Sequence, residues 1–170
     1  ASGLPADDER VAERLIRDMQ ASGDASMALR RLDVSVRLLI ARSQPDADAA
    51  AAMYDDAIAD LDRIADASDG GTHETYLLAK ALISRGRHHV RQGSALEARE
   101  DWTRAIALLG NAAKTSKDPN LIASWVDAHL LLGERARVEA QLAWLSDIGY
   151  RDPDFVGIAG GWVVARFQLQ

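Results

Sequence analysis

Apolar residues recur every three or four positions along most of the chain, which is the spacing of one face of an α-helix. Short breaks rich in Gly, Pro, Ser and Asp separate these segments. The pattern predicts helices over approximately residues 5–21, 25–42, 46–67, 73–92, 95–113, 119–132 and 134–147, followed by a short eighth helix from residue 153. No segment alternates apolar and polar residues with β-branched enrichment, so no strands are expected.

The first three predicted helices each have an apolar stripe that we expect to be buried. The stripe of the first consists of Val11, Leu15 and Met19. The inward residues of the second are expected to be Leu32, Val36, Leu39 and Ile40. In the third they are Ala50, Tyr54, Ala57, Leu61 and Ile64. The opposite face of the third helix is acidic and is expected to be solvated: Asp48, Asp55, Asp56, Asp60, Asp62 and Asp66.

Residues with known preferences for helix ends mark several of the boundaries. Ser94 followed by Glu97 predicts a capping box at the start of the fifth helix. Asp118 before Pro119 predicts an N-cap followed by a proline in the first turn of the sixth. Three glycines are predicted to end helices: Gly93, Gly133 and Gly149.

Small residues and one aromatic stand at fixed intervals within residues 79–112, namely Gly86, Ala98, Trp102 and Ala105. This spacing resembles that of a tetratricopeptide repeat, a unit of about 34 residues formed by two antiparallel helices. Leu82 and His89 occupy further packing positions of the repeat. Arg85 replaces its usual Leu, and Gly110 stands where Pro is common.

Two other segments resemble the same repeat. Residues 119–150, with Trp125 and Gly133, are similar to a degenerate copy, in which Val138 replaces the usual Ala and Leu142 and Leu145 follow at equivalent steps. Residues 31–64 resemble a weaker third copy. The resemblance implies an all-α, right-handed superhelix of antiparallel helical hairpins, with residues 1–170 as one domain. It also implies a concave face that holds a protein or peptide and has no catalytic role.

A second resemblance covers the last third of the chain, from Ala128 through Leu132-Gly133 to the segment from Gly149 to Phe155. This stretch is similar to the C-terminal repeat region of some bacterial eukaryote-like Ser/Thr protein kinases. The chain itself contains none of the kinase motifs: no Gly-rich loop, no His-Arg-Asp and no Asp-Phe-Gly. The resemblance implies a repeat region of a larger bacterial signalling protein.

Charge and composition exclude several classes of function. The net charge of −6 argues against nucleic acid as the main partner. The absence of cysteine excludes disulfides and thiolate sites, and it fits any compartment. The cytoplasm is slightly favoured over the periplasm. No apolar run reaches the roughly 18 residues that span a bilayer. The chain does not begin with Met, which is expected of a processed product or an excised piece of a larger protein.

The candidate partner-binding residues are basic and lie on the fourth predicted helix. Lys80, Arg87 and Arg91 are separated by seven and four positions, so they share one helical face. The repeat resemblance places this face in the groove, and Arg42 extends it from the second helix. Basic grooves in this family commonly hold carboxylates of peptides, which predicts an acidic peptide partner. The alternative is a solvated basic face that pairs with the acidic third helix.

No metal, cofactor or catalytic site is predicted. His88 and His89 are adjacent on a helix, so they point about 100° apart and rarely bind one ion together. His89 and His129 stand where the repeat packs an aromatic residue, which favours a core role. The acidic face of the third helix lacks the spacing of a calcium-binding loop. The competing function is an all-helical enzyme or small-molecule sensor, with His88 or His129 in a deep pocket beside carboxylates.

The C-terminal tail is apolar from Trp162 onwards, with Val163, Val164, Phe167 and Leu169. Left exposed, these side chains would form an unusual apolar patch on the surface. The tail is therefore expected either to pack on the last hairpin or to pair with a second copy of the chain in a homodimer.

Overall fold

The computed structural model describes residues 27–67, 72–152 and 155, and these form six α-helices, one 3₁₀ turn and no strand. The helices are α2 (Met27–Ser43), α3 (Ala47–Ala67), α4 (Thr72–Arg91), α5 (Ala95–Thr115), α6 (Pro119–Leu131) and α7 (Glu139–Asp147). All six agree with the segments predicted between residues 25 and 147, so the all-α class is confirmed. The predicted helices at 5–21 and from 153 lie outside the described residues.

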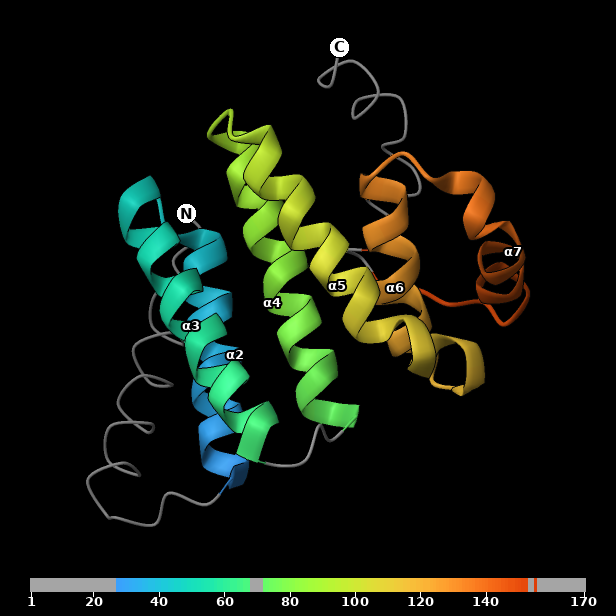
Figure 1. Ribbon diagram of the computed structural model, residues 1–170, viewed down its shortest axis with the longest axis horizontal. Helices are drawn as coiled ribbons and strands as arrows, with labels where there is room; N and C mark the ends of the chain where they lie inside the picture. The colour runs from blue at the N-terminus through green and yellow to red at the C-terminus, as the bar shows by residue number, and fades with distance from the viewer. Residues whose placement is uncertain (1–26, 68–71, 153–154, 156–170) are drawn as a thin grey trace, which may run out of the picture.

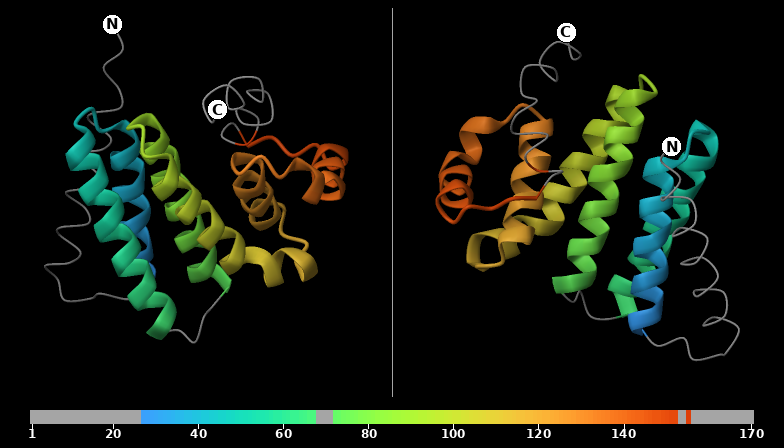
Figure 2. Two further views of the ribbon diagram at one scale, coloured as in Figure 1. Left: turned by 45° about the horizontal axis from the view of Figure 1, so that its top comes forward. Right: turned by 180° about the vertical axis from the view of Figure 1, so that it is seen from behind.

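From α2 to α6, consecutive helices run in opposite directions, and each helix packs against the next (Figures 1 and 2). In addition, α2 contacts α4, and α4 contacts α6. The even-numbered helices are therefore neighbours, although an odd-numbered helix separates them in the sequence. No helix in the described part of the chain is both long enough and apolar enough to cross a membrane.

The helix ends follow local backbone chemistry, with two differences from the prediction. Gly93, Gly133 and Gly149 all have positive φ, the left-handed conformation that ends helices. The Asp118 side chain accepts a hydrogen bond from the Asn120 amide at 2.9 Å, which confirms this N-cap. Ser94 also stands at an N-cap, but its side chain makes no capping hydrogen bond, so the predicted capping box is wrong.

The seventh predicted helix is shorter than expected. Residues Arg135–Arg137 form a separate 3₁₀ turn (η1), and α7 begins only at Glu139. Val138 stands between the two and is buried, as is Leu145 at the other end of α7. Because Val138 anchors the junction in the core, the chain changes direction there and does not continue as one helix.

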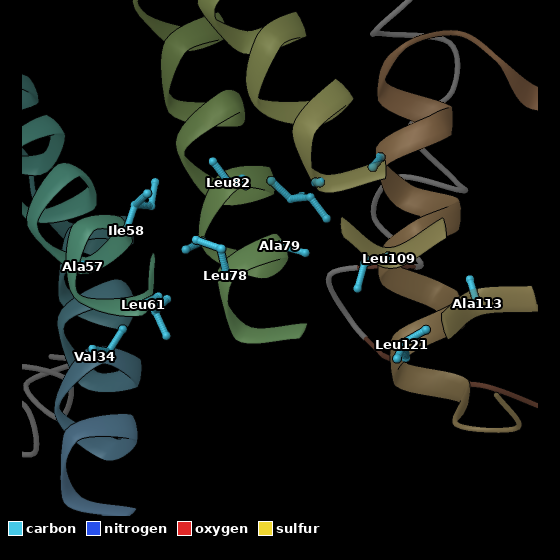
Figure 3. Close-up of a cluster of buried hydrophobic side chains, with 14 residues drawn as sticks. Val34, Ala57, Ile58, Leu61, Leu78, Ala79, Leu82, Leu109, Ala113 and Leu121 are labelled. Carbon is cyan, nitrogen blue, oxygen red and sulfur yellow. The ribbon is translucent and has the colours of Figure 1, made fainter. Parts of the chain in front are cut away.

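Two apolar clusters make up the core. The larger one joins five helices, from Val34 of α2 through Leu61, Leu82 and Leu109 to Leu121 of α6 (Figure 3). The smaller one consists of the buried residues Ile122, Ala123, Val126, Leu130, Val138, Leu145 and Phe155. Trp125 packs against both clusters, and Trp144 packs against the smaller one. The predicted inward face of α3 is confirmed, because Ala50, Tyr54, Ala57, Leu61 and Ile64 are all buried.

The predicted inward face of α2 is wrong for Leu32 and Leu39, whereas Val36 and Ile40 are partly buried. Leu32 and Leu39 are 50% and 58% exposed, while Val34 and Ala41 are buried. The face that packs on the other helices also carries Arg37, which pairs with Asp33 at 2.6 Å and with Asp60 of α3. An ion pair between the helices therefore occupies a place where an apolar contact was expected, and it orients α2.

Helices α4 and α5 approach each other closely at Gly86 and Trp102. Trp102 is only 2% exposed, and its indole N–H lies 3.4 Å from the Ile83 carbonyl oxygen. A Cβ at position 86 would lie 2.8 Å from Cδ1 of this ring. The predicted pairing of a small residue with an aromatic is therefore confirmed, and Gly86 is needed because any side chain would overlap the indole.

Candidate functional site

Three of the four predicted basic residues line one cleft. Arg42 from the end of α2, and Lys80 and Arg87 from α4, face a wall formed by α6 and the segment that follows α7. That wall includes Ser124, Asp127, Tyr150, Asp152 and Phe155. The cleft follows from the contacts of α4 with α2 and α6, which bring the three cations together from two helices.

The cleft is narrow and has mixed charge. Its volume is about 30 Å³, and a cavity needs roughly 10–15 Å³ to hold one water. The Tyr150 hydroxyl donates its hydrogen bond to Asn120 Oδ1 at 2.9 Å, and a carboxylate oxygen of Asp152 lies 3.4 Å from it. Burial and the neighbouring Asp152 raise the pKa of the Tyr150 hydroxyl, so it stays protonated and donates. This space suits water or the end of one polar side chain, and it is too small for a metabolite.

Two of the cations already have partners within the protein. An Nη atom of Arg87 lies 3.0 Å from a carboxylate oxygen of Asp127, and both side chains are largely buried. The Nζ of Lys80 lies 5.7 Å from the centre of the Tyr76 ring, a cation–π geometry. Arg87 therefore forms its ion pair with a residue of α6. The alternative in the sequence analysis was that the basic face pairs with the acidic third helix.

Arg91 lies outside this cleft, near Tyr54 of α3. Tyr54 is completely buried, and its hydroxyl lies close to the Arg91 guanidinium. Burial raises the pKa of Tyr54, and the guanidinium groups of Arg91, Arg42 and Arg87 lie near enough to oppose that shift. Lys80, Arg42 and Arg87 therefore line the cleft, and Arg91 follows one turn after Arg87 on α4; these four residues are called the basic strip.

An ion-pair cluster that the sequence did not reveal joins α3, α4 and α5. Arg85 contacts both carboxylate oxygens of Asp101, at 2.9 and 2.6 Å, and reaches Asp55 at 2.7 Å. Asp101 is buried, and His89 Nε2 lies 3.7 Å from it. The hydrogen bond with Asp101 is the main cause that raises the pKa of Arg85, so this cation stays charged.

The acidic face of α3 is exposed or partly exposed at all six positions, as predicted, and several of its carboxylates also form ion pairs. Asp55 pairs with Arg85, Asp60 with Arg37 and Arg63, and Asp62 with Arg104 at 2.5 Å. These carboxylates therefore fasten α3 to its neighbours. Within the described ranges, no group of three His, Asp or Glu side chains is arranged to hold a metal ion.

The histidines occupy packing positions. The ring of His129 is buried and lies 4.4 Å from the Trp125 ring, edge to face, while its Nδ1 is 2.8 Å from Glu134. His88 is also buried, with its ring 5.7 Å from Tyr54. His89 is partly buried, and its Nε2 lies 3.7 Å from Asp101 of the neighbouring helix α5.

Acidification from about pH 7.5 to about pH 5 is expected to destabilise the protein partly through His88. Burial lowers the pKa of His88, and Arg91 and His89 act in the same direction. The unfolded chain takes up this proton near the ordinary pKa of about 6.5, while the folded protein takes it up only at lower pH. The contribution of His88 is therefore complete above about pH 6.5 and is lost as the pH falls, by at most about 1.4 kcal/mol per unit.

Urea unfolding at several pH values measures this effect. His88→Gln removes this titration. The unfolding free energy of the variant should therefore fall less steeply with falling pH, so the difference in unfolding free energy between wild type and variant narrows at low pH. His73→Gln at an exposed histidine is the control. If the difference in unfolding free energy from the wild type narrows equally for His88→Gln and His73→Gln, His88 has no particular role in the pH dependence.

A second cavity, of about 520 Å³, adjoins α7. Its lining mixes the apolar residues Leu142, Ala143, Leu145, Tyr150 and Phe155 with the polar residues Arg135, Glu139, Ser146 and Arg151. Neither His88 nor His129 contributes to it. The apolar tail for which packing or dimerisation was predicted, from Trp162 onwards, lies outside the described residues.

Comparisons with known proteins give no match: neither a protein-family model, nor a curated protein, nor a solved structure is similar to this chain. Both resemblances noted in the sequence therefore stay predictions. What the site can do has to be argued from its own geometry.

Proposed function

We propose that this chain is a non-catalytic protein-interaction module of the tetratricopeptide-repeat type, which holds a peptide or protein partner against the strip formed by Arg42, Lys80, Arg87 and Arg91. A place within a bacterial signalling protein is part of the same proposal. The observation that carries it is the gathering of these four cations, from two helices, along one side of α4. The chain is otherwise acidic, so such a strip is a local feature of opposite charge.

The order of helix contacts supports the repeat architecture. Hairpins whose first helices neighbour one another, as α2, α4 and α6 do, place those helices in a common inner layer. Antiparallel pairs with a small residue facing an aromatic, as at Gly86 and Trp102, are the packing that the repeat requires. We infer that the layer of α2, α4 and α6 is the concave side of a right-handed superhelix.

The cavities favour binding over catalysis. An enzyme or small-molecule sensor would need a pocket in which titratable groups converge. The cleft beside Arg87 is too small for a metabolite, and the cavity at α7 has Glu139 as its one carboxylate among the described residues that line it. A partner that lies across the surface and contributes single side chains to narrow clefts fits this geometry better.

Replacing Arg87 and Arg91 with alanine is expected to weaken partner binding more than tenfold. Charge-assisted hydrogen bonds contribute about 1.5–3 kcal/mol when shielded and much less when solvated, so two losses in a partly shielded strip exceed a factor of ten. The partner is recovered by pull-down from the native host, and its affinity for wild type and variant is measured by calorimetry at two salt concentrations. Binding should weaken with salt, because the strip is partly screened by solvent.

Asp127→Asn supplies the matched control. It breaks the internal pair with Arg87 while leaving both arginines in place, so it should bind at least as tightly as the wild type. Circular dichroism establishes that each variant is folded. If wild type and the Arg87→Ala/Arg91→Ala variant bind the partner equally well, these residues are a solvated face and the proposal is wrong.

A further inference from the structure

We propose that the exposed apolar face of α2 is a docking surface for residues 5–21 of the same chain, which pack against it as an antiparallel amphipathic helix. The inference goes beyond the proposed function, because it does not involve the basic strip. It starts from α2 itself, which has apolar side chains on two opposite faces.

One face of α2 is buried by the helices that the structure describes. Val34 and Ala41 are each 1% exposed, and they lie on the face where α2 packs against α3 and α4. Arg37 pairs with Asp60 of α3 and helps to fix this orientation. These contacts leave other apolar side chains of α2 outside the core.

The second face carries Leu32, Val36 and Leu39, which are four and three positions apart and therefore share one side of the helix. Leu32 and Leu39 each precede a buried residue, Val34 or Ala41, by two positions, which is a rotation of about 200° around the helix axis. Leu32 is 50% exposed, Leu39 is 58% exposed and Val36 is partly buried. A helix that is apolar on opposite sides is normally covered on both. This stripe therefore indicates that a further element packs on α2.

Residues 5–21 have the sequence that matches this face. The spacing of Val11, Leu15 and Met19 predicts a helix with one apolar stripe, and Glu13 lies on its opposite side. The predicted helix has the same length as α2, 17 residues. Most of the stability of such a helix comes from packing its apolar face, so it needs a surface to pack against.

The short connection between the two segments favours an antiparallel hairpin. Only residues 22–26 separate them, and loops of about two to eight residues join neighbouring helices in bundles. In such a hairpin Leu15 comes opposite Leu32, and Val11 comes opposite Val36, because the members of each pair are equally distant from the turn. This arrangement continues the alternating directions of the helices from α2 to α6 (Figure 2).

A second copy of the chain fits this face less well. A stable dimer buries about 20–30 residues on each side, whereas the described part of this stripe consists of three residues. The tether of residues 22–26 gives residues 5–21 an effective concentration of about a millimolar at the face, without any cost of bringing two molecules together. The preceding segment of the same chain is therefore the occupant that we assign.

Introduced cysteine pairs test this contact, because the chain has no cysteine of its own. Leu15→Cys with Leu32→Cys joins the two apolar stripes. Glu13→Cys with Leu32→Cys is the matched control, since it closes a loop of nearly the same length from the polar side of residues 5–21. Each disulfide is equilibrated with glutathione, and the ratio of oxidised to reduced protein gives the effective concentration of the two thiols. We expect this concentration to be at least tenfold higher for the pair with Leu15→Cys.

Limited proteolysis tests the same contact with residues 5–21 unchanged. Trypsin cleaves after the three arginines of this segment, and a docked helix has to open before it is cut. Leu32→Glu/Leu39→Glu places charges on the docking face and should raise the cleavage rate at these sites at least tenfold, as measured by mass spectrometry. Leu96→Glu, at a leucine of α5 that is 75% exposed, should leave the rate unchanged. Slow cleavage within α4 and α5 shows that each variant is folded.

Several outcomes would overturn the docking surface. One is an equal effective concentration for the two cysteine pairs, and another is an equal cleavage rate in wild type and Leu32→Glu/Leu39→Glu. Disulfide-linked dimers at micromolar protein, in place of the intramolecular bond, would assign the face to a second copy. None of these measurements uses a peptide partner, so their failure leaves the proposed function to its own test.

Discussion

Replacing Trp102 with alanine is expected to destabilise the protein by about 3–5 kcal/mol, the usual cost of removing a buried indole. Trp102 is fully enclosed between α4 and α5, and its indole N–H faces the Ile83 carbonyl. Its removal leaves a cavity between α4 and α5. Since a domain has a total stability of about 5–15 kcal/mol, this one change is expected to bring the protein close to unfolding. Urea unfolding followed by circular dichroism measures the loss.

Gly86→Ala tests whether the contact itself, and not only the buried area, matters. Helix propensity alone predicts that alanine is better than glycine by about 1 kcal/mol. The new Cβ would overlap the Trp102 ring, and overpacking costs about 1–3 kcal/mol, so we expect a net loss. In a Trp102→Leu background the overlap is gone, and the same change should become neutral or stabilising. A similar effect in both backgrounds would refute the proposed contact.

Arg85→Ala is expected to cost about 3–5 kcal/mol, because it leaves the buried carboxylate of Asp101 without its cation. The loss of unfolding free energy is large because the carboxylate of Asp101 is shielded from water. The exposed pair between Arg104 and Asp62, whose side chains are 45% and 39% accessible, offers a direct comparison. Arg104→Ala should cost only about 0–1 kcal/mol, as is usual for surface ion pairs.

A double variant separates the value of the pair from the cost of breaking it. Arg85→Met together with Asp101→Leu removes both charges from the interface, and such replacements are often neutral or stabilising. Chemical denaturation of the three variants gives the comparison. If Arg85→Ala lowers the unfolding free energy no more than Arg104→Ala does, the charge of Asp101 is solvated without its cation. The ion-pair cluster then does not stabilise the packing of α3, α4 and α5.

The spacing of apolar residues was sufficient to predict the helices. It did not predict which face of a helix is buried where charged residues take part in the packing. The six described helices follow from apolar spacing and from glycine and proline at their ends. The stripe of α3 was predictable because its opposite face is acidic. Apolar residues surround α2 more evenly, so the sequence could not reveal that Val34 and Arg37, and not Leu32 and Leu39, face the neighbouring helices.

The candidate site was predictable only as a set of residues on one face. Lys80, Arg87 and Arg91 share that face because of helical geometry, which a sequence shows. The pair between Arg87 and Asp127, and the approach of Arg91 to Tyr54, depend on how α4 meets α6 and α3. Residues that are 40 or more positions apart, or on separate helices, come together only through the packing angles, which no local pattern records.

The binding role of the strip is tested most directly by backbone NMR of the labelled protein with two peptide pools. One pool is rich in Asp and Glu with free C-termini, and the other has Asn and Gln with amidated C-termini. We expect the acidic pool alone to shift the amide signals of α4 between Lys80 and Arg91 and of the end of α2 at Arg42, saturably and less at high salt. The signals on the exposed face of α5 should stay in place. Equal shifts with both pools, or shifts that leave α4 unaffected, would contradict the assignment of this face as the binding surface.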